Sequence, residues 1–263
     1  MICSRGSRRN EALVSFDCPT WILAVSLSFL ASAGKGMAGP PLEFDDPDTP
    51  GAGHWEINFA STMEKRASLW EFKPLLDLNY GWGERVQLKL KPRFVVLDPP
   101  GEGSRAGAGN IQFGVKWRFF DEAKHGIAIS VYPQADFNPP GRSIERGLVD
   151  NGHDLFLPLQ IARTFGRARL YADSGYNWRE GREDEWILGL AADYRLRDKF
   201  VPMMELRDLV QADFDDHELF FNAGFKLKLH EHWTLLAAAG RTVYESRGER
   251  AAVFSYLGLQ LLF

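Results

Sequence analysis

From residue 54 onward, apolar and polar residues alternate along the chain with a period of two. The clearest run is residues 85–96, RVQLKLKPRFVV, in which apolar side chains alternate with Gln, Lys and Arg. Residues 110–119 and 217–229 repeat the pattern. Strict alternation over about ten residues is typical of a β-strand with one apolar and one polar face.

The same pattern recurs often enough to predict an all-β protein. No helical periodicity of useful length competes with it. The pattern predicts about twelve strands, near residues 55–61, 72–80, 85–96, 110–120, 127–137, 154–165, 168–178, 185–196, 201–210, 217–229, 233–243 and 250–263.

The connections between these segments alternate between short and long. This alternation is typical of a membrane β-barrel, which has short turns at its periplasmic end and longer loops outside. An even strand count would return the C-terminus to the periplasmic end. The short connections are residues 81–84, 121–126, 166–167, 197–200 and 230–232, and the long or more polar ones are 62–71, 98–109, 138–153, 179–184, 213–217 and 245–250.

Aromatic residues gather at the strand ends on the apolar face, as the interfacial girdles of a membrane barrel require. Enrichment alone would be explained by the strand propensity of aromatic residues, but their position would not. The residues are Tyr80, Trp117, Phe119, Phe137, Phe165, Tyr176, Trp178, Trp186, Tyr194 and Phe263.

These patterns predict a single antiparallel transmembrane β-barrel over residues 53–263, with outer-membrane lipids as its surroundings. A closed barrel pairs every backbone polar group in lipid and leaves no open edge. The alternative is an exported soluble β-sandwich, which also gives each strand one apolar face. The sandwich does not explain the alternating connections or the aromatic girdles.

The first 52 residues carry an export signal and a linker. Three arginines precede the apolar run WILAVSLSFL, and Ala31-Ser32-Ala33 follows, which predicts a cleavable signal peptide over residues 1–33. Both cysteines, Cys3 and Cys18, fall within it. Residues 34–52 are rich in Gly, Pro and Asp, which predicts a flexible lead-in to the barrel.

Three prolines interrupt the predicted strands. Pro92, Pro133 and Pro158 each lack the N–H that a strand ladder requires. They predict bulges or strand ends at these positions.

The polar faces predict a lumen of mixed charge. A lysine facing lipid at mid-membrane would cost roughly 2–4 kcal/mol, so the charged residues of the strands are assigned inward. They either fill the lumen with cross-strand ion pairs or line a polar, weakly anion-attracting channel. The lumen-lining candidates are Lys89, Lys91, Arg93, Lys116, Arg118, Asp173, Asp193, Glu205, Arg207, Lys226 and Lys228.

The C-terminal strand, LGLQLLF, resembles that of Gram-negative outer-membrane β-barrels. The resemblance implies an outer-membrane location. It also implies that Leu257, Leu259, Leu261 and Phe263 form a signal for the barrel-assembly machinery. The last strand would close the barrel by pairing with the first, near residues 55–59.

A second resemblance is to the transporter family of phenol meta-pathway degradation. It rests on the strand GNIQFGVKW and on the proline of the strand that follows. The matching positions are Gly109, Asn110, Ile111, Gly114, Lys116, Trp117 and Pro133. This resemblance implies an outer-membrane transporter, some relatives of which serve aromatic catabolism. A polar lumen suits an aromatic hydrocarbon poorly.

Signals for other functions are weak. The net charge of −4 argues against nucleic-acid binding. Outer-membrane phospholipases use a His–Ser pair, for which His153 and Ser174 are the best candidates, although no signature surrounds them. His230 and His232 could chelate a metal ion but are more typical of a solvated turn. The sequence therefore predicts neither a catalytic site nor a cofactor.

We expect a channel or transporter for small solutes. Two alternatives remain open from the sequence. One is a membrane-embedded lipid hydrolase that uses His153 and Ser174. The other is a structural or adhesive barrel that presents residues 138–152 and the acidic loop ADFDDHE.

Overall fold

The computed structural model describes residues 39–138, 141–246 and 252–263. The predicted signal peptide, residues 1–33, lies outside the described residues. The strands are β1 (Trp55–Arg66), β2 (Leu69–Trp82), β3 (Val86–Asp98), β4 (Arg105–Phe120), β5 (Ala128–Val131), β6 (Gln134–Phe137), β7 (His153–Phe165), β8 (Ala168–Arg179), β9 (Glu185–Tyr194), β10 (Phe200–Gln211), β11 (His217–Lys228), β12 (Trp233–Glu245) and β13 (Val253–Leu262). Within these described ranges, two one-turn helices, α2 (Glu122–His125) and α3 (Arg142–Glu145), lie in connections.

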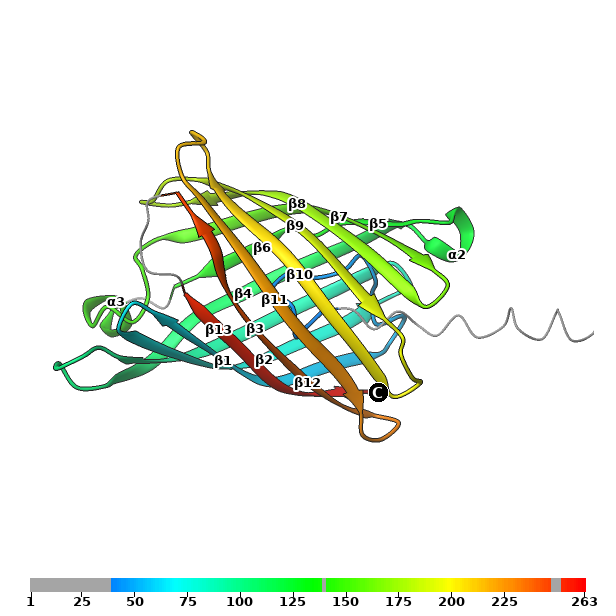
Figure 1. Ribbon diagram of the computed structural model, residues 1–263, viewed down its shortest axis with the longest axis horizontal. Coiled ribbons are helices and arrows are strands. Elements are labelled where there is room, and N and C mark those ends of the chain that lie inside the picture. The colour runs from blue at the N-terminus through cyan, green and yellow to red at the C-terminus, as the bar shows by residue number, and fades with distance from the viewer. Residues whose placement is uncertain (1–38, 139–140, 247–251) are drawn as a thin grey trace, which may run out of the picture. The chain divides into compact units, whose positions relative to one another are not determined.

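The strands form one closed antiparallel barrel (Figure 1). β5 and β6 both pair with β4 on one side and β7 on the other, so they are two halves of one interrupted strand. The barrel therefore has twelve strands, as the alternation predicted. β13 pairs with β1, with Leu261 opposite Ile57 and Leu259 opposite Phe59, which confirms the predicted closure.

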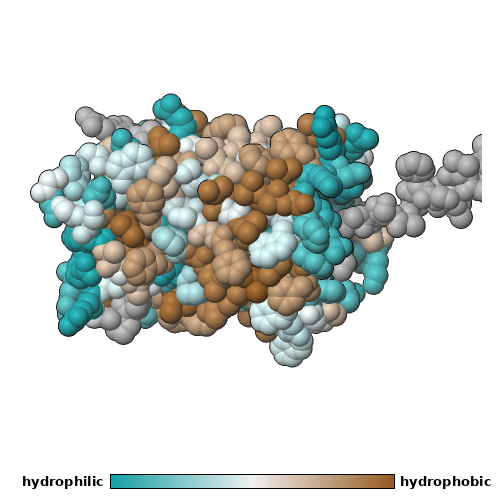
Figure 2. Space-filling model, turned by 90° about the horizontal axis from the view of Figure 1, so that it is seen from below, coloured by the Kyte–Doolittle hydropathy of each residue, from teal (hydrophilic) through white to brown (hydrophobic). Residues whose placement is uncertain are grey.

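The alternating pattern separates an apolar outside from a polar inside. On β9 the outward Leu190 is 64% exposed, whereas the inward Ala191 is buried. Figure 2 shows a band of hydrophobic surface across the middle of the barrel, with hydrophilic surface at both ends. Such a band is what the hydrocarbon layer of a membrane requires. Among the described residues, no helix is both long and apolar enough to cross a membrane.

The prolines explain the local irregularities. The register of the β3–β4 ladder shifts between Pro92 and Phe94, and Pro133 separates β5 from β6. Pro158 on β7 lies beside the same break, where its carbonyl accepts a hydrogen bond from the backbone N–H of Tyr132. Pro133 and Pro158, neither of which has a backbone N–H, thus lie at the same gap in the ladder. Few ladder hydrogen bonds are therefore lost.

The connections differ at the two ends of the barrel. We call the end where β1 begins and β13 finishes the terminal end, and the opposite end the loop end. Turns at the terminal end span residues 83–85, 121–127, 166–167, 195–199 and 229–232. Loop-end connections include residues 99–104, 138–152, 180–184 and 212–216. Most of the predicted alternation is confirmed.

One predicted long loop is wrong. Residues 62–71 were expected to form a long connection, but β1 continues to Arg66 and β2 starts at Leu69, leaving a two-residue turn. The polar residues of this segment belong to the strands. Arg66, for example, points across to Glu218 of β11, with 2.8 Å between Arg66 Nη2 and Glu218 Oε1. A strand that extends past the membrane carries polar residues on both faces, so it loses the alternation that marks strands within lipid.

Candidate functional site

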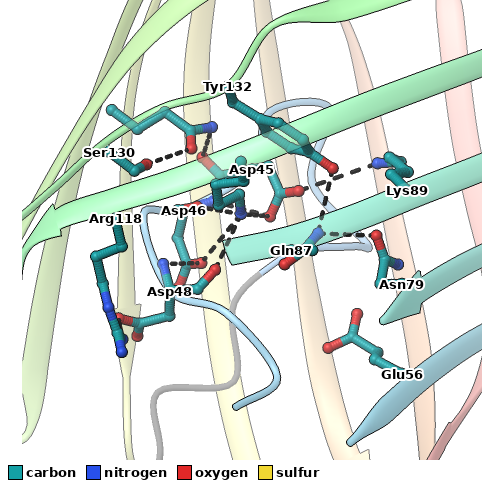
Figure 3. A network of polar contacts seen from close by, with 12 residues as sticks. Asp45, Asp46, Asp48, Glu56, Asn79, Gln87, Lys89, Arg118, Ser130 and Tyr132 are labelled. Atoms are coloured by element: carbon teal, nitrogen blue, oxygen red, sulfur yellow. Dashed lines mark hydrogen bonds and ion pairs between the residues drawn. The ribbon is translucent and has the colours of Figure 1, made fainter. Parts of the chain in front are cut away.

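A segment before β1 folds into the barrel lumen. Residues 41–49, which we call the strap, have no regular secondary structure and lie among the inward side chains of the strands (Figure 3). Pro41 and Asp46 of the strap are buried. The sequence predicted only a lead-in here, so the entry of this segment into the lumen was not foreseen.

Basic residues on one side of the lumen hold the acidic side chains of the strap. Lys116 Nζ on β4 lies 3.3 Å from Asp45 Oδ1 and also donates to the backbone carbonyls of Asp46 and Asp48. Arg118 Nη1, two residues further on the same face of β4, lies 3.2 Å from Asp48 Oδ1. Figure 3 shows Asp48 of the strap beside Arg118. Lys116 is only 1% exposed, so these contacts compensate for a charge removed from water.

Two more cations complete this basic side of the lumen. Arg169, at the start of β8, lies 3.4 Å from Asp46 Oδ2 and donates to the carboxylate of Asp48. Lys89 on β3 pairs with Asp77 of β2 at 3.6 Å and reaches Asp45 of the strap at 4.0 Å. Three carboxylates of the strap therefore face cations contributed by β3, β4 and β8.

The opposite side of the lumen holds the strap by its backbone. The carboxylate of Glu205 on β10 accepts the backbone N–H of Glu43, at 2.8 Å from one oxygen and 3.1 Å from the other. Asn222 on β11 donates to the same carboxylate at 2.9 Å. Arg207 of β10 lies 3.3 Å from the carboxylate of Glu43. The strap thus spans the lumen from β4 to β10.

The strap also has an apolar contact with the barrel. Leu42 packs in a buried cluster with Ala128, Ala162, Tyr171, Ala191 and Met203, and the ring of Phe44 packs against this cluster. Gly189 of β9 lies so close to Phe44 that an added Cβ would be 2.6 Å from the ring. A glycine at this position allows the close approach.

Burial and the surrounding cations affect the two adjacent aspartates of the strap differently. Burial raises the pKa of Asp45, but the charges of Lys116 and Lys89 outweigh it, and the net pKa is below its ordinary value. Burial raises the pKa of Asp46 to about 7, and the negative charge of Asp48 adds to this effect. Asp45 is therefore the more firmly ionised of the two.

Further ion pairs occupy the lumen towards the loop end. Arg93 of β3 donates to Asp136 of β6 at 2.7 Å, and Gln112 of β4 donates to the same carboxylate at 2.8 Å. Arg66 and Glu218 form a second pair, in which Glu218 also accepts from Thr242. Cross-strand ion pairs and the strap therefore both occupy the polar interior.

The structure brings six of the predicted lumen residues into the strap site. Lys89, Lys116, Arg118, Glu205 and Arg207 contact the strap directly, and Asp173 accepts a hydrogen bond at 3.5 Å from Gln160, which donates to the carbonyl of Asp45. Of the other candidates, Arg93 pairs with Asp136, and Lys91 is half-buried between Lys89 and Arg93. Lys226 is buried on β11, Asp193 is half-buried near the end of β9, and Lys228 is exposed at the end of β11.

The acidic residues of the strap were missed by sequence reasoning. Asp45, Asp46 and Asp48 lie in a Gly- and Pro-rich segment that carries no periodic pattern. The available signal was an excess of acids immediately before a barrel whose inward faces carry many lysines and arginines. Such charge complementarity indicates an internal contact but does not specify its partners.

The pair considered for lipid hydrolysis is not assembled. Ser174 on β8 lies opposite Leu159 of β7, whereas His153 begins β7, six residues away. At about 3.3 Å per residue the two side chains are separated by roughly 20 Å, far beyond hydrogen-bond reach. Within the described part of the chain, no group of three or more His, Cys, Asp or Glu side chains is arranged to hold a metal ion.

The C-terminal residues predicted as an assembly signal lie at the barrel seam. Leu257 and Phe263 point outward and are 62% and 54% exposed, while Gln260 between them is buried in the lumen. Leu259 and Leu261 are partly exposed and face Phe59 and Ile57 across the ladder. The backbone of Phe263 exchanges two hydrogen bonds with Trp55.

The fold is shared with solved outer-membrane channels. The COG4313 outer membrane channel from Pseudomonas putida F1 matches with a TM-score of 0.71 and 12% identity, over 84% of this chain and all of that one. The KdgM porin matches with a TM-score of 0.58 and 10% identity, over 79% of this chain and 99% of that one. The NanC porin matches with a TM-score of 0.59 and 9% identity, over 78% of this chain and 98% of that one. No family model matches the sequence, and no curated protein sequence does. The chain therefore shares the closed antiparallel barrel fold of these outer-membrane proteins.

Proposed function

We propose that the protein is a channel for small solutes in the Gram-negative outer membrane, and that its strap restricts passage. The observation that carries this proposal is the closed barrel whose polar lumen is crossed by residues 41–49, held by ion pairs and side-chain hydrogen bonds. Contacts of this kind are exchangeable, unlike a strand ladder, so the strap can leave while the barrel stays intact.

The similar structures support this proposal. Those with the same overall fold are described as a channel and as porins. The separation of His153 from Ser174 removes the specific basis for a lipid hydrolase. We further propose that the C-terminal strand engages the barrel-assembly machinery, supported by its outward leucines and Phe263 at the seam.

We also propose that the cargo belongs to aromatic catabolism. The support for this is the sequence resemblance to the phenol meta-pathway transporters, carried by residues such as Asn110, Lys116 and Pro133. Lys116 of that motif is the residue that binds the strap most extensively.

Channel recordings in planar bilayers test the proposed function. We expect the wild-type protein to conduct ions weakly, because the strap occupies the lumen. Replacing residues 42–48 with a Gly/Ser sequence of the same length should raise the conductance severalfold. A matched control replaces the acidic loop at residues 212–216 in the same way and should leave the conductance unchanged. Bilayers that stay sealed with both the wild-type protein and the strap variant would reject a channel.

A further inference from the structure

The strap occupies a composite site on the barrel wall, apolar on one side and cationic on the other. Leu42 and Phe44 fill the apolar side against Ala191 and Met203. Asp45, one residue further, turns to Lys116. An aromatic ring followed directly by carboxylates is therefore what this wall already binds.

The two sides of the site adjoin at Tyr171. Tyr171 belongs to the apolar cluster that holds Leu42, and the guanidinium of Arg169 lies 5.3 Å from the centre of its ring. Lys116 Nζ likewise lies 4.6 Å from the ring centre of Tyr132. Cations placed over aromatic faces stay close to apolar surface while keeping their charge available to an anion.

Release of the strap would leave the cations of this site without most of their ion-pair partners. Within the described residues, the ion-pair and hydrogen-bond partners of Lys116 Nζ all come from the strap. Arg169 keeps a weaker pair with Glu122 at 3.7 Å but loses Asp46 and Asp48. A buried ammonium without a partner is costly, so an empty site favours a replacement anion.

We propose that the barrel wall formed by Lys116, Arg169, Tyr171 and Gly189 is a binding site for aromatic carboxylates, and that the strap is its internal competitor. The ring of the ligand takes the place of Phe44 against Gly189, and a carboxylate of the ligand takes the place of the strap carboxylates that pair with Arg169. This inference rests on the proposed channel function and names its substrate class. An aromatic acid is also compatible with the polar lumen, whereas an aromatic hydrocarbon is not.

Hydrogen exchange on the full-length protein tests this directly, without requiring conduction. The amide of Glu43 is protected by Glu205 when the strap is bound. We expect terephthalate, an aromatic dicarboxylate, to speed exchange in residues 41–48 severalfold. Terephthalamide, its neutral analogue, and adipate, a dicarboxylate without a ring, should have little effect. Exchange in the β-strands should not change.

Two variants provide the matched comparison. Arg169→Gln should abolish the terephthalate effect, whereas Arg182→Gln should preserve it, because Arg182 pairs with Asp150 and Asp154 at the loop end. Equal acceleration by terephthalamide or by adipate would overturn the aromatic-carboxylate site, as would no response to terephthalate. If the strap variant conducts but terephthalate has no effect, this inference fails alone; sealed bilayers would instead reject the channel.

Discussion

At the scale of single residues, Gly189 determines whether the strap can sit against the barrel wall. A glycine inside a strand normally weakens it, because it has no side chain to pack. Here the missing side chain leaves room for the ring of Phe44, which would otherwise be 2.6 Å from a Cβ. The residue therefore serves the contact with the strap and not the strand itself.

We predict that Gly189→Ala loosens the strap without unfolding the barrel. Overpacking a tight contact costs about 1–3 kcal/mol, and even 1–2 kcal/mol shifts an equilibrium by a factor of about 5–30. Hydrogen exchange in residues 41–48 should accelerate by about that factor. In a Phe44→Ala background the same substitution should have almost no further effect, because the clashing ring is gone. Equal effects in both backgrounds would show that Gly189 acts through the strand.

At the scale of elements, the sequence predicted the strands and not the strap. Each strand in the membrane has one face in lipid and one in the lumen, so its residues must alternate and the pattern is visible locally. β1 beyond Ser61 leaves that environment, and there the prediction failed. The strap contacts residues of β3, β4, β7, β8, β9 and β10, and no period in its own sequence indicates such distant partners.

The charges of the strap predict that its binding depends on salt. Opposite charges attract less strongly as ionic strength rises, and the released carboxylates and cations are better screened in solution. Raising NaCl from about 0.05 M to about 0.5 M should therefore speed exchange in residues 41–48 severalfold while the strand amides stay protected. The variant Asp45→Asn/Asp48→Asn should exchange faster at low salt and lose most of this dependence, because it removes the strap carboxylates that pair with Lys116, Arg118 and Arg169. A salt response that persists unchanged in the double variant would contradict the assigned ion pairs.

At the scale of the whole molecule, one alternating pattern supplies an apolar face to the lipid and a polar face to the lumen. Outward positions such as Leu190 and Leu257 form the apolar band, and inward positions such as Glu205 and Gln260 lie buried in the lumen. The assignment of charged residues to the inside could be made from the sequence because a charge in lipid is so costly. Which of those charges pair with one another, and which contact the strap, depends on the closed shape of the barrel. These pairings could therefore not be predicted from the sequence.

The apolar band predicts that a charged substitution on the outside of the barrel lowers the free energy of unfolding by an amount that depends on its depth in the membrane. Leu190 lies at the middle of β9 and is 64% exposed, whereas Leu196 lies in the connection after β9 and is 48% exposed. Leu190→Arg should lower the free energy of unfolding from lipid vesicles by about 2–4 kcal/mol, and Leu196→Arg by about 0–1 kcal/mol, because arginine at an interface stays hydrated. Urea titrations that follow the loss of the folded form on gels measure both. Similar penalties for the two variants would mean that the brown band of Figure 2 does not lie in the hydrocarbon layer.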